Sequence, residues 1–261
     1  MRITTWNINS VRLRLEMLAR VMKETRADIV CLQEIKAQNV DFPADAIAAL
    51  GFPHQLVRGF KSYNGVAILS RIPIKEGDSQ DWCGKADSRH MVGVLPGGVE
   101  LHNFYVPAGG DIPDPEQNDK FAHKLRFLSE MKLWFSGQKP GKRILLGDLN
   151  IAPREADVWS HKQLLKVVSH TPVEVEHLDG LMEAQDWVDA VRHFIPEPEQ
   201  VYSWWSYRNR TWPGSDRGRR LDHIWVTPAL KMSLTGIDLL REARGWKQPS
   251  DHIPITVDID L

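Results

Sequence analysis

Short apolar stretches of strand length recur along the chain, each rich in β-branched, aromatic or leucine residues. Turn-forming residues or longer polar segments separate them, which is the pattern of buried or half-buried strands. The stretches are RITTWNI (2–8), DIVCLQE (28–34), GVAILS (65–70), VELHNFYV (99–106), RILLGD (143–148), LDHIWVT (221–227) and ITVDIDL (255–261). The hydrophobic pattern therefore predicts a protein built on β-sheets.

Two segments between these stretches have the spacing of amphipathic helices, with apolar residues three, four or seven positions apart. The first begins after Ser10, a residue type that suits a helix N-cap. Their apolar positions are Val11, Leu15, Leu18 and Met22 in the first segment, and Phe121, Leu125, Leu128 and Phe135 in the second. We expect both helices to pack on the surface of a sheet.

Other strands are joined by turns instead of helices. Asn64-Gly65 favours a tight turn before one strand, and Pro96-Gly97-Gly98 favours another. The Pro-, Gly- and Asp-rich stretch 107–119 is typical of a surface loop that leads into the second helix. Hairpins beside helical crossovers indicate an α/β fold of mixed sheets covered by helices.

Length and composition fit one globular domain over residues 1–261. The first residues lack the apolar core of a signal peptide, and no apolar run approaches the roughly 18 residues of a membrane helix. The two cysteines, Cys31 and Cys83, are too few for a disulfide framework, so we expect a reducing, cytoplasmic location. The formal net charge of −1 provides no global attraction for nucleic acid, which would require a local basic patch.

Polar side chains recur at or beside the ends of the apolar stretches. Each of them alone has an ordinary structural explanation, because Asn and Asp favour turns and caps. Together they form a set that could converge at one edge of a sheet protein: Asn7, Asn9, Glu34, Tyr105, Asp148, Asn150, Asp222, Asp251 and His252. Carboxylate and amide oxygens without cysteine suit a hard ion such as Mg²⁺, which indicates phosphoester chemistry.

Seven sequence blocks resemble the exonuclease III family of apurinic/apyrimidinic (AP) endonucleases, within the endonuclease/exonuclease/phosphatase superfamily. The blocks run in the order of that family from residue 6 to residue 254: WNINSVRLR, CLQEIK, SYNGVAILS, NFYVP, GDLNIAP, RRLDHIWV and SDHIP. The resemblance implies a four-layered α/β sandwich, DNase I-like, in which two packed mixed β-sheets are flanked by helices and the active site lies at one edge.

The resemblance also implies a metal site. Glu34 would be the principal ligand of Mg²⁺, with Asn7 and Asp251 near the ion, and Mn²⁺ could replace it. One ion or two remain open as alternatives, because Asp148, Asn150 and His252 could ligate a second ion.

Position by position, the resemblance assigns catalytic roles as well. Asp148 would orient or deprotonate the attacking water, and Asn150 would hold that water or a phosphate oxygen. His252 would contact the phosphate and be oriented by Asp222. Tyr105 would direct its phenol at the phosphate. Hydrolysis of a phosphodiester needs such a positioned water and donors aimed at the charged oxygens.

A local basic patch is present in residues 202–220, where tryptophans alternate with five arginines: Arg208, Arg210, Arg217, Arg219 and Arg220. Arginines can neutralise DNA phosphates, and aromatic faces can contact sugars or bases. The alternative is a core strand followed by a solvated loop. The resemblance places Trp205 and Leu221 in a pocket for an abasic sugar and Arg208 where the family inserts a side chain into the duplex. We expect Arg210 and Arg217 to bind DNA too.

Two positions depart from the family pattern. Ala108 stands where many relatives carry a phosphate-contacting Asn or Gln, so that contact is lost or passes to backbone N–H groups. Arg219 stands where some relatives place an aromatic side chain against the abasic sugar. These departures leave the balance among AP-endonuclease, 3′-to-5′ exonuclease and 3′-phosphatase activities open.

The sequence thus predicts a Mg²⁺-dependent DNA-repair phosphodiesterase acting on double-stranded DNA with abasic sites or blocked 3′ ends. It predicts a monomer with no obligate protein partner and no membrane contact. One alternative is a phosphodiesterase or phosphatase of the same superfamily that acts on small molecules or lipid headgroups. Another is a non-catalytic DNA-binding module, which the unbroken set of acidic residues disfavours.

Overall fold

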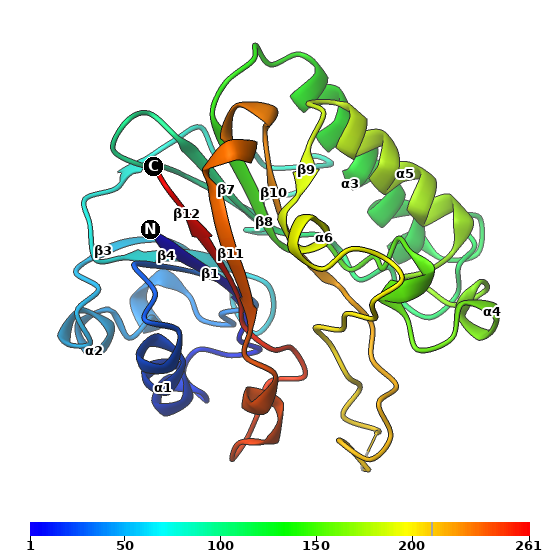
Figure 1. The fold of residues 1–261 in the computed structure, drawn as a ribbon, viewed down its shortest axis with the longest axis horizontal. Coiled ribbons are helices and arrows are strands. Elements are labelled where there is room, and N and C mark those ends of the chain that lie inside the picture. The colour runs from blue at the N-terminus through cyan, green and yellow to red at the C-terminus, as the bar shows by residue number, and fades with distance from the viewer. Residues whose placement is uncertain (210) are drawn as a thin grey trace.

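Two six-stranded mixed β-sheets pack face to face in the computed structural model, which describes residues 1–209 and 211–261 (Figure 1). The first sheet has the order β11 (Leu234–Leu239), β12 (Ile255–Ile259), β1 (Arg2–Asn7), β2 (Ile29–Gln33), β4 (Val66–Ser70) and β3 (His54–Arg58). The second has the order β5 (Lys75–Glu76), β6 (His90–Val94), β7 (Glu100–Tyr105), β8 (Arg143–Asp148), β10 (Asp222–Val226) and β9 (Val188–Asp189).

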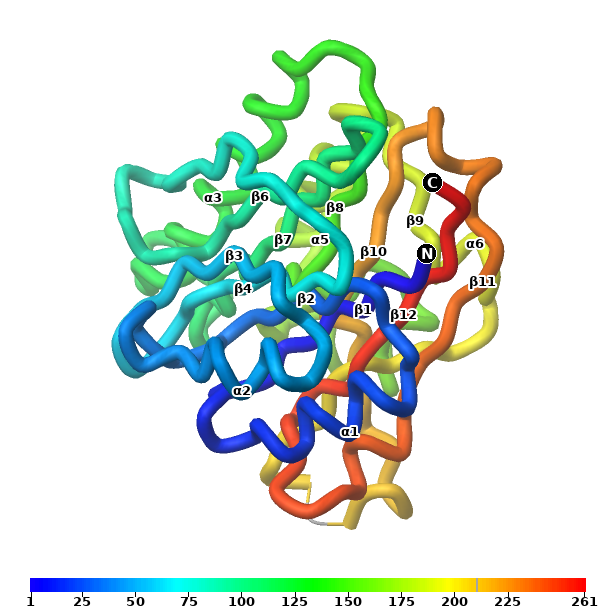
Figure 2. The backbone as a smooth tube through the Cα atoms, turned by 90° about the vertical axis from the view of Figure 1, so that its left-hand side faces the viewer, coloured from blue at the N-terminus to red at the C-terminus, as the bar shows by residue number. Residues whose placement is uncertain are grey.

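Helices cover the outer face of each sheet, so the molecule has four layers (Figures 1 and 2). Helices α1 (Leu15–Thr25) and α2 (Ala44–Ala49) pack on the first sheet, while α3 (Asp119–Ser136) and α5 (Pro172–Glu183) pack on the second. The remaining elements are short: α4 (His161–Leu164), α6 (Ala190–Phe194), η1 (Asn39–Asp41), η2 (Glu155–Asp157), η3 (Pro228–Ser233) and η4 (Arg241–Gly245). In the described residues, none of the helices is both long enough and apolar enough to cross a bilayer.

The seven predicted strands and both predicted helices are present, and the four-layered α/β sandwich is confirmed. The start of the first helix was predicted wrongly. Helix α1 begins at Leu15 with Arg14 at its N-cap, because the chain after Ser10 first makes a turn over residues 11–14. Helix α3 begins as a capped helix, with the Asn118 side chain accepting a hydrogen bond from the Lys120 backbone N–H.

The two central strands of each sheet are parallel, and every other neighbouring pair is antiparallel. Strands β1 and β2 form the parallel pair in the first sheet, and β7 and β8 form it in the second. The second pair stays in register to its last residues, where Tyr105 lies opposite Asp148. Gly147 permits this, because its φ is +131° and a Cβ would lie 2.0 Å from the Phe104 carbonyl oxygen.

Strand alternation explains why polar side chains at these strand ends enter the space between the sheets. Ile3 of β1 and Ile144 of β8 belong to the core between the sheets, and side chains on a strand change face at every residue. Asn7 lies four residues after Ile3, and Asp148 lies four residues after Ile144. Both polar residues therefore lie at the ends of the inward-facing rows that begin with Ile3 and Ile144.

A buried polar contact joins the two sheets beneath these strand ends. The Gln33 Nε2 of the first sheet donates to the Asn103 Oδ1 of the second at 2.7 Å. The Asn103 Nδ2 donates in return to the carbonyl oxygens of Leu32 and Ala67, each at 3.0 Å. Both amide side chains are fully buried. Because unpaired buried amides are costly, these bonds favour one alignment of the sheets over others.

We expect Asn103→Leu to lower the free energy of unfolding by about 3 kcal/mol or more, because three buried partners lose their hydrogen bonds. The double variant Thr4→Val/Thr256→Val is a matched control, since it replaces both members of the 2.8 Å Thr4–Thr256 hydroxyl pair and should be nearly neutral. Urea unfolding followed by circular dichroism measures both effects. Equal stability of the two variants would contradict a special role for the contact between the sheets.

Candidate active site

A cleft of about 520 Å³ opens at the edge where the central strands end. Its lining combines four carboxylates, an imidazole, a phenol, an amide and two guanidinium groups. The residues are Glu34, Tyr105, Ala108, Gly110, Asp111, Asp148, Asn150, Val167, Val168, Ser169, Trp204, Ser206, Arg208, Arg219, Leu221, Asp251 and His252. The predicted convergence of polar strand ends is therefore observed.

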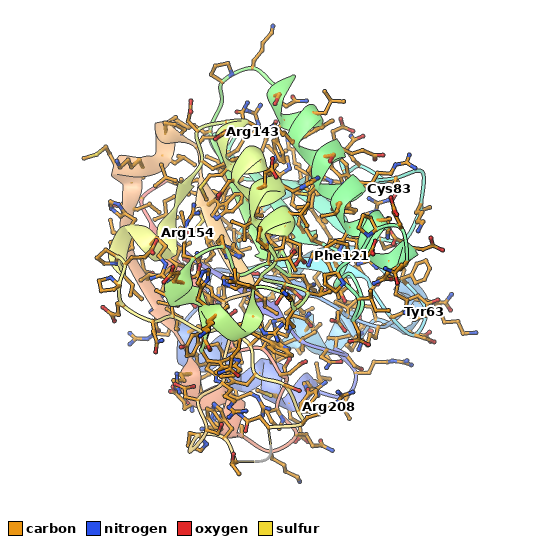
Figure 3. All side chains as sticks on the ribbon, turned by 90° about the vertical axis from the view of Figure 1, so that its right-hand side faces the viewer. Tyr63, Cys83, Phe121, Arg143, Arg154 and Arg208 are labelled. Atoms are coloured by element: carbon orange, nitrogen blue, oxygen red, sulfur yellow. The ribbon has the colours of Figure 1, made fainter. Side chains whose placement is uncertain are left out.

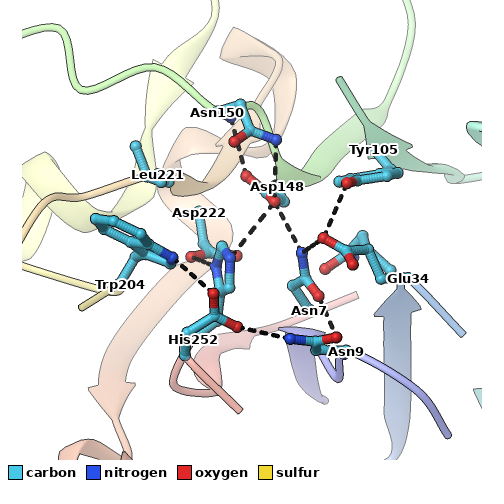
Figure 4. Close-up of polar contacts among 12 residues, drawn as sticks. Asn7, Asn9, Glu34, Tyr105, Asp148, Asn150, Trp204, Leu221, Asp222 and His252 are labelled. Atoms are coloured by element: carbon cyan, nitrogen blue, oxygen red, sulfur yellow. Dashed lines mark hydrogen bonds and ion pairs between the residues drawn. The ribbon is translucent and has the colours of Figure 1, made fainter. Parts of the chain in front are cut away.

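The Asn7 amide connects the two sheets at the floor of the cleft. Its Nδ2 donates to Glu34 Oε1 and to Asp148 Oδ2, each at 2.9 Å (Figure 4). Asn7 is itself fully buried. One amide group therefore holds a carboxylate of the first sheet and a carboxylate of the second close together.

Glu34 turns into the cleft because its backbone departs from the strand conformation. Its φ is +50°, a value rare outside glycine, so the side chain does not follow the alternation of β2. Glu34 Oε1 accepts from the Tyr105 hydroxyl at 2.8 Å, and Oε2 pairs with the Lys36 ammonium at 2.8 Å. Although burial raises the pKa of Glu34, the Lys36 charge and these hydrogen bonds lower it overall, so the carboxylate is ionised.

Tyr105 is the neutral partner of this carboxylate. Burial, followed by the nearby Glu34 and Asp148 charges, raises the pKa of the phenol well above its usual value. The hydroxyl therefore keeps its proton and donates it to Glu34 in a hydrogen bond. Its single proton could reach another anion in the cleft only if the hydroxyl turned away from Glu34.

His252 lies between two carboxylates of the second sheet. Its Nδ1 lies 2.8 Å from Asp222 Oδ2, and its Nε2 lies 3.7 Å from Asp148 Oδ2. Burial lowers the pKa of His252, but the Asp222 and Asp148 charges outweigh it and raise the pKa to about 10. The imidazole is therefore a cation whose Nε2 faces the cleft, and Asp222 fixes its orientation.

Asp148 is buried and surrounded by charge. Burial raises its pKa to about 7, the His252 charge opposes this, and the Asp222 charge adds to it. Asn150 supports it through a backbone N–H that donates to Asp148 Oδ1 at 2.9 Å. A carboxyl group whose pKa lies near neutral pH, and which is held beside an imidazole, has the properties of a group that exchanges protons.

Asp251 is fixed through both of its oxygens. Oδ1 accepts from Asn9 Nδ2 at 3.1 Å, and Oδ2 accepts from the Trp204 indole N–H at 3.0 Å. Asn9 also accepts from the Lys36 ammonium at 2.6 Å, so it links Asp251 to the Glu34 side of the cleft. The segment that follows the first strand and the segment that precedes the last strand thereby contribute to one cluster.

A buried ion pair supports the cleft from behind. Lys124 of α3 pairs with Glu174 of α5, and both side chains are fully buried. The Lys124 ammonium also donates to the Asn150 carbonyl oxygen at 2.7 Å and to the Ala108 carbonyl oxygen at 3.3 Å. Glu174 accepts two hydrogen bonds from the Ser169 backbone N–H, at 3.0 and 2.9 Å. The pair thus fixes three segments that line the cleft.

The prediction that Trp205 lines a sugar pocket is wrong. Trp205 is 0% exposed, and its indole N–H donates to Asp216 Oδ1 at 2.7 Å. Neighbouring residues on an extended segment face opposite sides, and it is Trp204 that borders the cleft together with Leu221.

The five arginines of the predicted patch have different environments. Arg220 does not belong to the patch, because it is fully buried and paired with Asp157 and Asp189. Arg208 is exposed at the cleft, at the end of the molecule opposite Arg143 (Figure 3). Arg217 is exposed above the Trp159 ring in a neighbouring hollow of about 610 Å³, which Arg208 and Arg219 also line. Arg210 lies outside the described residues.

Ala108, the other departure from the family pattern, lines the cleft together with Gly110. Neither residue carries a polar side chain, so only backbone groups can meet a ligand there. Lys124, Glu174 and Lys36 were not predicted as part of the site. The sequence TPVE at residues 171–174 is a helix-start signal that could have located Glu174, because Thr171 and Glu174 form a capping box.

Oxygen donors dominate the groups that can hold a metal ion. Asp148, Asp222 and His252 offer ligand atoms within 4.8 Å of one another, and Glu34 approaches from the other sheet through Asn7. His252 is bound to Asp222 as a cation, which leaves carboxylate and amide oxygens as the available ligands. This donor set fits a hard divalent cation.

The fold consists of two mixed sheets packed face to face, and a cleft lined by carboxylates and an imidazole opens at one edge. This combination defines a class of α/β sandwich proteins whose sites suit phosphoester chemistry. The model described as the Endonuclease/Exonuclease/phosphatase family matches residues 4–252, and the chain belongs to this family.

Full-length similarity extends to individual relatives. Exodeoxyribonuclease III of Haemophilus influenzae is 27% identical, and the alignment covers 98% of each chain. The structure of the 3′ phosphatase NExo from Neisseria, bound to product DNA hairpin, is 30% identical with a TM-score of 0.90, and that of an AP endonuclease from Archaeoglobus fulgidus is 28% identical with a TM-score of 0.90. Both alignments cover 100% of each chain. The predicted resemblance to the exonuclease III family is thereby confirmed.

We expect Lys124→Met to lower the free energy of unfolding by about 3 kcal/mol, because it leaves the buried Glu174 carboxylate without its cation. Lys120→Met is the matched control, since Lys120 is exposed on the same helix and the change should stay within about 0.5 kcal/mol. Thermal and urea unfolding measure both. A Lys124→Met variant as stable as the control would show that the pair contributes little.

Proposed function

We propose that this protein is a divalent-metal-dependent DNA-repair phosphodiesterase that hydrolyses the backbone 5′ to abasic sites, with 3′-to-5′ exonuclease and 3′-phosphatase activity. The observation that carries the proposal is the cleft in which Glu34, Asp148 and the His252–Asp222 pair lie beside Trp204 and arginine side chains. The relatives support DNA as the substrate class, since they are named exodeoxyribonuclease III, AP endonuclease and a 3′ phosphatase bound to DNA.

The proposed ion is Mg²⁺, with Mn²⁺ as a substitute. Glu34, Asn7 and Asp251 would hold it. Asp148 and Asn150 would take part if a second ion binds, and His252 would join them only after losing its proton. Such an ion supplies Lewis-acid polarisation of a phosphate oxygen and neutralises its charge. The ionised state of Glu34 supports this assignment, because a carboxylate must be deprotonated to bind a cation.

The protein side chains would carry the proton transfers. Asp148 accepts a proton from the attacking water, and Asn150 orients that water. The His252 imidazolium donates a hydrogen bond to the phosphate while Asp222 holds its ring. The neutral Tyr105 hydroxyl donates to the negative charge that develops on the phosphate.

Trp204, Leu221 and the arginines would hold the DNA. Arg208, Arg210 and Arg217 would contact backbone phosphates, while Trp204 and Leu221 would border the abasic sugar. The Arg217–Trp159 contact of 4.7 Å offers both a cation and an aromatic face to a nucleotide. A small-molecule or lipid-headgroup phosphodiesterase would have no use for this surface, so the arginine cluster favours DNA.

The function is tested with a 5′-labelled duplex that contains one abasic site. We expect incision that depends on Mg²⁺, is abolished by EDTA and leaves a 3′-hydroxyl on the 5′ side of the site. Asp148→Asn should reduce turnover by about a thousandfold or more, because the water loses its proton acceptor, while DNA binding persists. Asp45→Asn, an exposed acid on α2, is the control and should be fully active.

Two outcomes would contradict this function. EDTA-resistant cleavage, or a product with an unsaturated 3′ sugar, would indicate a lyase instead of a hydrolase. Loss of DNA binding in parallel with turnover in Asp148→Asn would assign Asp148 a structural role. Duplexes with a recessed 3′ end and with a 3′-phosphate end measure the other two activities in the same assay.

The proposed phosphate contacts are tested by changing Arg208, Arg210 and Arg217 together to Ala. Each true phosphate contact contributes about 0.9 to the slope of log affinity against log salt, so the slope should become shallower by that amount per contact. Hydrolysis of a p-nitrophenyl phosphodiester, where measurable in the wild type, should persist because the carboxylate cluster lies on other segments. An unchanged salt slope would favour the small-molecule alternative.

A further inference from the structure

The wall of the cleft contains a fixed guanidinium group at Arg219. Its Nη1 donates to the Val168 carbonyl oxygen at 2.9 Å and to the Ser169 hydroxyl at 2.7 Å. The Arg219 backbone N–H donates to the Trp204 carbonyl oxygen at 3.0 Å, and the guanidinium carbon lies 5.4 Å from the centre of the Trp204 ring. Side chain and backbone are therefore both held in place before any ligand binds.

The support for Arg219 continues into the buried ion pair. Ser169 has a strained φ of +86°, and its backbone N–H donates to Glu174, which is paired with Lys124. Glu174 is nevertheless saturated by other donors and makes no hydrogen bond with Arg219 in the described part of the chain. The Arg219 charge thus lacks a carboxylate hydrogen-bonded to it there.

Arg219 is linked to the reacting groups through Trp204. The Trp204 ring on which it rests donates its indole N–H to Asp251, the neighbour of His252 in sequence. Arg219, Asp148 and His252 line the same cleft. Within residues 1–209 and 211–261, only Nη1 of the Arg219 guanidinium has a hydrogen-bond partner, so Nε and Nη2 remain available to a ligand.

Burial makes an uncompensated cation costly. It lowers the pKa of Arg219 from its usual value, and the Glu174 charge offsets this only in part. The guanidinium would be stabilised by an anion that binds within the cleft. Arginine is well suited to phosphate oxygens, which it can bind through two parallel N–H groups.

The two substrate types of the proposed function differ in charge at this wall. At an internal abasic site the phosphate is a diester with one negative charge, and a neutral sugar lies against Trp204, Leu221 and Arg219. At a blocked 3′ end the phosphate is a monoester with a charge of about −1.5 to −2 near pH 7, and its additional oxygen takes the place of the sugar. A fixed cation on this wall stabilises the second arrangement more than the first.

We propose that Arg219 binds the terminal oxygens of a 3′-phosphate and makes DNA ends with a 3′-phosphomonoester the favoured substrate of this cleft. The inference rests on the proposed function and names its preferred substrate. In the reaction, the oxygen of water forms a bond to phosphorus and the bond from phosphorus to O3′ breaks. O3′ takes up one proton and leaves as the 3′-hydroxyl, and inorganic phosphate is released.

The experiment compares two duplexes of the same sequence, one with an internal abasic site and one with a 3′-phosphate at a one-nucleotide gap. The kcat/KM of each is measured with Mg²⁺ for the wild type, Arg219→Met and Arg219→Lys. We expect Arg219→Met to lower 3′-phosphate removal about 10- to 100-fold relative to abasic incision, the size of one charge-assisted hydrogen bond. Arg219→Lys keeps the cation and should restore part of the ratio.

Arg217→Met is the matched control, because Arg217 belongs to the same segment but lines the neighbouring hollow. Arg217→Met should lower kcat/KM for both substrates by a similar factor and leave the ratio of the two values unchanged. Inorganic phosphate provides a second measurement: as an inhibitor of abasic incision, it should bind Arg219→Met about tenfold more weakly than the wild type. Retained abasic incision shows that the Arg219 variants are folded.

Equal losses on both substrates in Arg219→Met would overturn the inference and leave Arg219 with a purely structural role. Inhibition by inorganic phosphate that is equally strong in Arg219→Met and in the wild type would overturn it as well. A wild-type protein that cleaves neither duplex would instead overturn the proposed function, and this inference with it. That result is seen before any substitution is made, so the two failures are distinguishable.

Discussion

The hydrogen bond between Gln33 and Asn103 joins the two sheets within a core that consists mostly of apolar side chains. Apolar contacts are not directional, so they favour burial without choosing one alignment of the sheets. A buried amide pair does choose, because any other alignment leaves its donors and acceptors unpaired. Glu34 follows Gln33 directly, and Tyr105 lies two residues after Asn103. The alignment fixed by the amides therefore sets the distance between the two halves of the cleft.

Four carboxylates gather at this cleft, and their mutual repulsion must be offset within the protein. Lys36 pairs with Glu34, the His252 imidazolium lies between Asp222 and Asp148, and hydrogen bonds from Asn9 and Trp204 satisfy Asp251. These partners offset the repulsion among the carboxylates without removing the negative charge of the cluster. The fold thus maintains an acidic site that fits a divalent cation, flanked by arginines that fit an anionic backbone.

The layers of the fold and the members of the acidic cluster followed from local patterns. Strand-length apolar runs predicted the central strands, and polar residues at their ends predicted Asn7, Tyr105, Asp148 and Asp222 because alternation is a local property of a strand. The supporting residues were harder to identify. Lys124 and Glu174 lie on two helices, 50 residues apart, and a charged side chain on a helix is usually solvated. Only their contact in the folded protein shows that both are fully buried.

By itself, the sequence determined the class of fold, the family and most of the groups in the cleft, because these depend on periodicity and on short blocks of adjacent residues. The tertiary structure alone decided which side chains of the tryptophan and arginine segment face the cleft and which are buried. Trp204 borders the cleft while Trp205 is buried, and Arg220 pairs with Asp157 while Arg219 faces the cleft. The physical reason is that neighbouring residues of equal chemistry differ only in the partners that distant segments bring to them.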